Sequence, residues 1–270
     1  MSKFNDAISE IENMSQMAQK DQWVNNMHPL VKLFLTILYI VLVVSFNRYN
    51  LSGVFAMIVY PIFAFIICDL SWKEAFYRLR VVLPLVCIIG LFNPLFDTAI
   101  ITYIPGPGGP IAVSAGVMSM ITIIVKGVFT VLASYILIAT TTIEKICYAL
   151  RLIHVPKILV TEIMLIYRYI TVLLGEAKRI TQAYSLRAPG QKGVHYKVWG
   201  SLVGQFLIRS MDKADIVYES MCLRGYNGEF SFVEKSSITG TDIIYLCVWT
   251  AIFIGFRVFP IISIVGGLFG

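Results

Sequence analysis

Five apolar runs constrain this chain more than any other feature of its sequence. They cover residues 30–46, 51–68, 81–96, 111–140 and 243–270. A helix needs about 20 predominantly apolar residues to cross a bilayer, because the hydrocarbon core is about 30 Å thick. Charged residues make up only 14% of the chain and hydrophobic residues 57%, whereas soluble domains are about 25% charged. We therefore predict an all-α polytopic membrane protein with about five transmembrane helices.

Two of the runs are irregular. Residues 81–96 contain Pro84, Gly90 and Pro94, so we expect a kinked or short span there. Residues 111–140 are too many for one untilted span, which leaves either one long tilted helix or a helix with an interrupted end. Lys126 is costly in hydrocarbon, so we expect it to face the bundle or to reach an edge. The proline- and glycine-rich stretch 104–110 predicts a loop.

The remaining segments complete the predicted organisation. The N-terminal residues carry both signs of charge and lack the order of a cleavable signal peptide. Ile8, Ile11, Met14 and Met17 recur at three- and four-residue spacing, which predicts an amphipathic helix that lies on a surface. Lys32 stands at the start of the first run, where it can extend to the interface. We divide the chain into an N-terminal segment, a transmembrane bundle, a cytoplasmic helical region and a last transmembrane helix, at 1–27, 28–140, 141–241 and 242–270.

The distribution of basic residues predicts the orientation. The connector 69–80 contains three basic residues, whereas the loop 97–110 contains none. Segment 141–235 holds thirteen basic and eight acidic residues, a net +5 of the chain's +6. Because basic residues concentrate in cytoplasmic segments, we place the N-terminus, 69–80 and 141–235 inside. The C-terminus then lies outside.

Segment 141–241 contains two long amphipathic helical patterns, at 157–187 and about 200–224. Each has an apolar stripe and many charges, so we expect both to be too polar to span lipid and to lie across one another beneath the bundle. Arg209 stands three residues before Asp212, a spacing that allows a weak ion pair on one helix.

Both helical patterns end in an arginine near glycine. The first ends in Ser185-Leu186-Arg187-Ala188-Pro189-Gly190, and the second in Met221-Cys222-Leu223-Arg224-Gly225-Tyr226. Glycine after a helix allows the left-handed turn that ends it, and a cation there is favoured by the helix dipole. Arg187 and Arg224 are therefore either C-terminal caps or two cations that a lever presents to a partner.

The sequence contains no motif of a catalytic or metal site. The three histidines, His28, His154 and His195, form neither HExxH nor HxH, and the five cysteines form no CxxC pair. Neither a GxxxxGK[ST] phosphate loop nor a GxSxG elbow occurs. We predict no catalytic residue, no metal ligand and no cofactor in this chain, and no partner among the nucleic acids.

Several stretches, in order, resemble the transmembrane T component of energy-coupling factor (ECF) transporters, in the cobalt-type branch. The matching stretches are His28-Pro29-Leu30-Val31-Lys32, Thr140-Thr141-Thr142, Ala149-Leu150-Arg151-Leu152-Ile153-His154-Val155-Pro156, Leu165-Ile166-Tyr167-Arg168-Tyr169-Ile170 and the two arginine-bearing helix ends. The resemblance covers most of 28–230. The ordered combination is specific, whereas one piece alone is weak.

The resemblance implies a non-catalytic subunit of an ATP-driven importer in a prokaryotic cell membrane. A membrane bundle would precede long coupling helices, whose small residue-Arg-Gly ends would dock on two ABC-type ATPase subunits. Arg224-Gly225 matches that pattern, whereas at Arg187 a proline intervenes and the glycine is displaced to Gly190. Further implied partners are a substrate-binding membrane S component and a small accessory membrane subunit. The implied substrate is cobalt.

Other functions stay open at this stage. The substrate of an ECF importer could equally be nickel or a vitamin. From a different class, an intramembrane lipid-modifying enzyme could use Lys126 or Arg168, although the runs lack the paired carboxylates that would favour it. A self-sufficient carrier is disfavoured because the runs contain few polar groups to line a path.

The charge distribution makes a direct prediction of topology. A tag fused after Gly270 should be digested by protease added to intact cells, and a tag before Met1 should be protected. Immunoblotting of both fusions checks this, with a cytoplasmic protein as the control for cell integrity. Protection of the C-terminal tag together with digestion of the N-terminal one would reverse the orientation.

Overall fold

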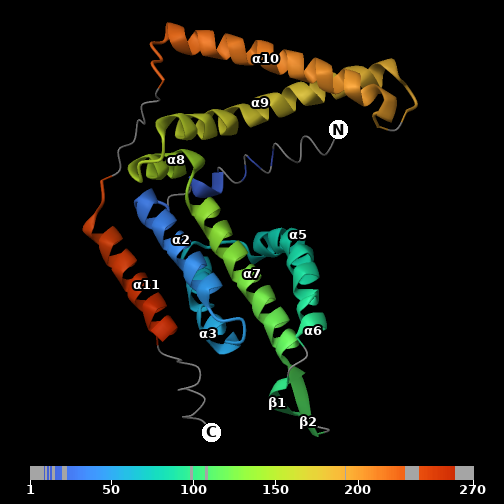
Figure 1. Ribbon diagram of the computed structural model, residues 1–270. Helices are drawn as coiled ribbons and strands as arrows, with labels where there is room; N and C mark the ends of the chain where they lie inside the picture. The colour runs from blue at the N-terminus through green and yellow to red at the C-terminus, as the bar shows by residue number, and fades with distance from the viewer. Residues whose placement is uncertain are drawn as a thin grey trace. The chain divides into compact units, whose positions relative to one another are not determined.

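The computed structural model describes residues 9, 11, 13, 16–19, 23–97, 100–106, 109–191, 193–228 and 237–258. Within it the chain forms two compact units. One contains residues 18–141 and 236–270, and the other contains 1–17 and 142–235. We describe each unit by itself (Figure 1). The predicted N-terminal helix and Pro260 fall mostly or wholly outside the described residues.

The first unit is a helical bundle built around the helix α7. Its elements are α2 (Pro29–Ser45), α3 (Leu51–Ala56), α4 (Val59–Ile67), α5 (Trp72–Leu91), α6 (Asn93–Phe96), β1 (Ile100–Gly106), β2 (Gly109–Ser114), α7 (Ala115–Thr140) and α11 (Gly240–Val258). α7 packs against α2, α3, α4, α5 and α6, and α11 packs against α2. An aromatic cluster of Tyr39, Tyr60, Trp249 and Phe253 fills the core between them.

The predicted helical membrane architecture is confirmed. Among the described helices, α7, α11 and α9 (Lys157–Arg187) of the other unit are long and apolar enough to cross a membrane. Exposed leucine, isoleucine, valine and phenylalanine side chains cover the outside of α2, α4 and α5. Such a surface is costly in water and favourable in lipid. The number of spans and their orientation stay predictions.

The second apolar run is two helices rather than one, and Pro61 explains the break. A continuous helix would need the N–H of residue 61 to bind the carbonyl of Met57, and proline has no N–H. The chain therefore turns between α3 and α4. The hydroxyl of Tyr39, fully buried on α2, donates to the Met57 carbonyl at 3.0 Å and replaces the missing donor.

Two other predicted boundaries change. The polar connector 69–80 and most of the third run form one continuous helix, α5, which passes through Pro84. Residues 111–114 are not helical, and α7 begins at Ala115, where the Ser114 hydroxyl accepts from the Val117 N–H at 3.4 Å. The predicted loop 104–110 is largely wrong, because β1 and β2 pair as an antiparallel hairpin in which Ile104 is opposite Ile111.

Lys32 does not extend to the interface as we predicted. Its side chain is buried, and its amine donates to the Thr140 carbonyl at 2.8 Å and to the Asn25 carbonyl at 3.3 Å. The last carbonyls of α7 have no intrahelical partner. Lys32 therefore satisfies the end of α7 and fixes that end to α2.

Lys126 follows the prediction that it faces the bundle. Its amine donates to the carbonyls of Val44 and Phe46 at 3.0 and 2.5 Å, where α2 ends. Arg257 of α11 donates to the neighbouring Ser45 carbonyl at 3.2 Å, and its guanidinium lies 4.6 Å from the Phe46 ring centre. Two cations thus complete the end of α2, which the negative end of its helix dipole favours.

The second unit consists of helices that match the sequence patterns closely. α8 (Ile143–Leu152) begins where the Thr142 hydroxyl accepts from the Lys145 N–H. α9 has the predicted bounds, and a short 3-10 helix η1 (Tyr196–Val198) leads into α10 (Trp199–Leu223). By length and composition α9 also meets the requirements of a membrane helix, so the expectation that both long helices are too polar to span lipid stays a prediction.

The packing of α6 against α7 makes a prediction about Gly116. A Cβ at this position would lie 2.5 Å from the Pro94 Cα and 2.6 Å from the Asn93 carbonyl oxygen. Because both are backbone atoms, Gly116→Ala should force the helices apart and destabilise the protein by about 2 kcal/mol. Thermal unfolding in detergent should show a lower midpoint. Gly255→Ala on α11 is the matched control, because a Cβ added there would meet no atom within 4 Å outside its own stretch of helix backbone. Equal midpoints for the two variants would contradict the packing.

Candidate functional site

The end of α10 is closed by a glycine turn. Gly225 has φ +81°, in the left-handed region that glycine enters without a Cβ penalty. Its N–H bonds to the Cys222 carbonyl, and the N–H of Tyr226 bonds to the Met221 carbonyl, both at 3.0 Å. This pair of bonds is the Schellman motif, which satisfies the last carbonyls of a helix by backbone alone.

Arg224 immediately precedes this glycine, at the C-cap position of α10. Its side chain is exposed, and the described residues supply it with no hydrogen bond or ion pair. Gly225 and Tyr226 bind the Cys222 and Met221 carbonyls, so these two carbonyls do not require the guanidinium as a cap. Leu223 beside it is also exposed, at 89%. The end of α10 therefore presents a leucine and an arginine to solvent.

The end of α9 is built differently. Arg187 is its last residue, and the Ala188 N–H bonds to the Tyr184 carbonyl at 3.1 Å. Pro189 and Gly190 then form a separate turn, in which Gly190 has φ +97° and the Gln191 N–H bonds back to the Ala188 carbonyl at 3.3 Å. Proline followed by a glycine with positive φ is typical of a type II turn.

The displaced glycine therefore serves this turn and not the helix end itself. The Tyr184 hydroxyl and the Gln191 side chain hold the turn against α9 with a 2.7 Å bond. Arg187 is exposed, and Leu186 before it is 81% exposed. The two helix ends thus differ in backbone and share an exposed Leu-Arg pair.

α9 and α10 run in opposite directions along one another (Figure 1). A charged contact joins them: Arg209 Nη1 donates to Glu176 Oε1 at 2.6 Å, and Arg179 donates to the other carboxylate oxygen at 3.4 Å. The Arg209 guanidinium holds the pKa of the Glu176 carboxyl below its usual range. The weak Arg209–Asp212 pair that we predicted is replaced by this contact between helices. Sequence spacing along one helix could not reveal it.

The histidines have local roles. The buried His28 ring accepts from the Leu30 N–H at 3.2 Å and so caps α2, while the backbone N–H of His28 donates to the Asp242 carboxylate at 3.3 Å. His195 accepts from the Lys197 N–H at the start of η1, and His154 occupies an exposed turn with φ +65°. Within the described residues, no three His, Cys, Asp or Glu side chains converge as metal ligands.

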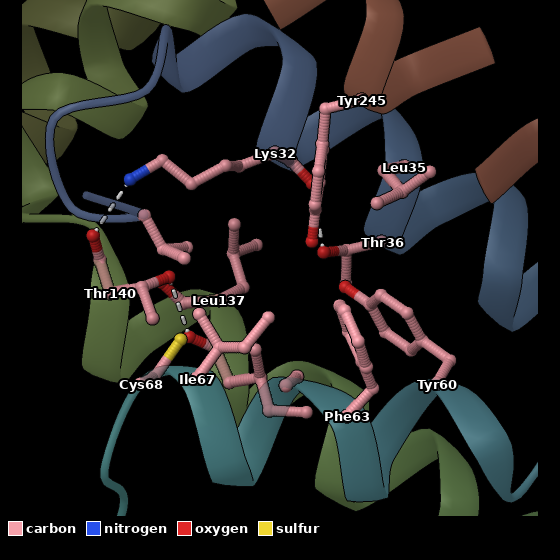
Figure 2. A pocket seen from close by; sticks show the side chains of 13 residues that line it. Lys32, Leu35, Thr36, Tyr60, Phe63, Ile67, Cys68, Leu137, Thr140 and Tyr245 are labelled. Carbon is pink, nitrogen blue, oxygen red and sulfur yellow. Dashed lines mark hydrogen bonds between the residues drawn. The ribbon is translucent and has the colours of Figure 1, made fainter. Parts of the chain in front are cut away.

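A small cavity lies inside the bundle unit between α2, α4, α7 and α11 (Figure 2). Its volume is about 20 Å³, which admits about one water molecule. Lys32 lies at its edge with its amine turned toward Thr140, and Tyr60 and Tyr245 supply aromatic walls. The cavity is too small for a cofactor or a vitamin.

Comparison with known proteins found relatives that match part of the chain. Two uncharacterised proteins of Methanocaldococcus jannaschii are similar: MJ1571 is 29% identical over 109 residues, which are 40% of this chain and 37% of that protein. MJ1089 is 32% identical over 97 residues, 35% of this chain and 36% of that protein. A putative fused cobalt transport protein CbiMQ of Methanocorpusculum labreanum is 32% identical over 102 residues, 37% of this chain and 17% of that protein.

The chain thus spans well under half the length of each of these relatives. The family model described as cobalt transport protein, CbiQ, matches residues 20–237. That range includes α2 to α10 and both arginine-bearing helix ends, so the match covers the paired helices and all of the bundle helices except α11. With its helices of membrane-spanning length and composition, the chain belongs to the CbiQ family of cobalt transport proteins and is a membrane protein.

Proposed function

We propose that this protein is the energy-coupling transmembrane subunit of an ECF-type importer, most directly one for cobalt ions. It transmits the motion of ABC-type ATPase subunits to a substrate-binding membrane subunit. One observation carries this proposal: at the end of α10 the Met221 and Cys222 carbonyls are bound by backbone N–H groups, and the exposed Arg224 guanidinium is available to a partner.

The partner that fits is an ATPase with two nucleotide-binding domains, one for each exposed arginine. A planar guanidinium recognises carboxylates and carbonyls through paired hydrogen bonds. The exposed Leu186 and Leu223 beside these arginines offer the partner an apolar surface next to each cation. The name of the fused relative joins two cobalt-transport parts in one chain, which supports a substrate-binding membrane subunit as a second partner. A small accessory membrane subunit completes the proposed complex.

The two long helices can act as levers. α9 has 31 residues and α10 has 25, so they extend about 46 and 37 Å. When ATP closes the ATPase domains, clefts that hold Arg187 and Arg224 change their separation and pull on the helix ends. Rigid helices carry such a displacement along their length. The bundle and the substrate-binding subunit beside it then receive the motion.

We place α8, α9 and α10 on the cytoplasmic side of a multi-pass protein. α9 carries seven charged residues, of which Glu176, Lys178, Arg179 and Arg187 lie in its second half. Glu176 is also bonded to a charged residue of α10, a helix with no buried residue. These features favour a helix at the membrane surface over a span, although the first half of α9 is apolar.

The alternatives are weaker. A lipid-modifying enzyme would need a free nucleophile or acid, and the Lys126 amine is bound to two carbonyls at the end of α2. A nickel or vitamin importer would use the same coupling helices, so the coupling experiment below does not depend on the transported substrate.

The proposal predicts that Arg224→Ala disrupts the complex and not the fold. A buried, hydrogen-bonded interface cation contributes about 2–5 kcal/mol, so ATPase affinity should fall at least about thirtyfold and uptake should be lost. Arg224→Lys should fail similarly, because lysine cannot form paired bonds. Arg187→Ala should act more mildly, since its glycine is displaced. Co-purification of the ATPase and cobalt uptake by cells are the measurements.

A matched control is Lys213→Ala, which removes another exposed cation of α10 away from its end. This variant should bind the ATPase and transport normally. The capping interpretation predicts instead a loss of at most about 1 kcal/mol in this subunit's own stability. Full ATPase association and uptake in both arginine variants would exclude the coupling role.

A further inference from the structure

A charged contact joins the paired helices α9 and α10 between their ends, from Glu176 of α9 to Arg209 of α10. No residue of α10 is fully buried, so apolar packing against α9 is limited to half-buried side chains such as those of Leu202 and Phe206. The Glu176–Arg209 bond of 2.6 Å is short and charge-assisted, which makes it about twice as strong as a neutral hydrogen bond. The Glu176 side chain is 22% exposed and that of Arg209 49%, so water screens the bond only partly.

The position of this contact determines the geometry of the two ends. Arg187 follows Glu176 by 11 residues, and Arg224 follows Arg209 by 15. At about 1.5 Å per residue these distances are about 16 and 22 Å. Because the helices are antiparallel (Figure 1), the two arginines lie on opposite sides of the contact. Their separation is therefore about 40 Å.

We propose that Glu176 and Arg209 are positioning residues that pin α9 to α10 and so set the separation of Arg187 and Arg224. This inference rests on the proposed function and specifies its partner: an assembly with two docking clefts about 40 Å apart. The contact also prevents α9 and α10 from rotating relative to each other. A displacement of one helix end is therefore transmitted to the other helix.

The consequence of losing the pin follows from the lever lengths. A rotation of α10 by about 15° at the contact moves an end about 22 Å away by about 6 Å. Hydrogen bonds of a guanidinium tolerate only a few tenths of an ångström around 2.9 Å. Both ends can therefore dock together only when the crossing of the helices is fixed.

The separation can be measured in the full-length subunit without reference to transport. Spin labels are placed on Ser185→Cys and the native Cys222, both exposed, after the exposed Cys87 and Cys247 are replaced by serine. The labelled positions follow Glu176 and Arg209 by 9 and 13 residues, which amounts to about 33 Å along the two helices. Double electron–electron resonance should therefore give one narrow distance of about 3.3 nm. Arg209→Gln should broaden that distribution.

Arg179→Gln is the matched control, because Arg179 bonds to the same carboxylate from within α9 and does not join the helices. This variant should keep the narrow distance. A charge exchange, Glu176→Arg with Arg209→Glu in the Arg179→Gln background, should restore it. Recovery of the narrow label distance would show that the ion pair between the helices, and not the identity of either residue, holds the two helices in place.

In the assembled importer, Arg209→Gln should retain the ATPase and lower uptake per ATP hydrolysed by about fivefold or more, with recovery in the charge exchange. An unchanged label distance in Arg209→Gln would overturn the pin. A broadened distance with normal uptake per ATP would overturn its role in coupling. Failure of wild-type protein to bind an ATPase would refute the proposed function instead, while the label distances would still decide on the pin.

Discussion

The bundle depends on hydrogen bonds to the backbone carbonyls that its helices leave without an intrahelical partner. In lipid, water cannot satisfy them, so protein donors must. Tyr39 serves the carbonyl that Pro61 frees, Lys32 serves the end of α7, and Lys126 with Arg257 serves the end of α2. These bonds connect α2 to the turn between α3 and α4, to α7 and to α11, and so they also fix the bundle.

The same constraint separates structural cations from available ones. In the bundle, Lys32, Lys126 and Arg257 bind carbonyls and are not available for chemistry or partners. At the end of α10 a glycine with positive φ satisfies the carbonyls by backbone bonds, and Arg224 is left exposed. Because the Arg224 guanidinium breaks no bond to its own helix when it binds elsewhere, it is suited to binding another protein. This contrast connects the fold to the proposed coupling role.

Sequence patterns predicted the elements better than their contacts. Apolar periodicity gave the bounds of α9, and glycine chemistry gave the turn at Gly225, because both depend on neighbouring residues. The helix break at Met57 depends on the missing N–H of Pro61 and on Tyr39 from another helix, so the residues around Met57 did not predict it. The roles of Lys32 and Glu176 likewise depend on partners more than 30 residues away. A stretch rich in glycine and proline was read as a loop, although strand pairing extends through most of it.

The exposed Leu-Arg pairs offer the most direct test of the central claim, that the ends of α9 and α10 contact an ATPase. A photo-crosslinking amino acid at Leu223, which is 89% exposed, would be irradiated in membranes that contain the co-expressed ATPase, with Val81 on α5 as a lipid-facing control position. We expect an ATPase adduct from position 223 and none from position 81. Adducts with lipid alone at position 223, in membranes where both proteins are present, would contradict the account.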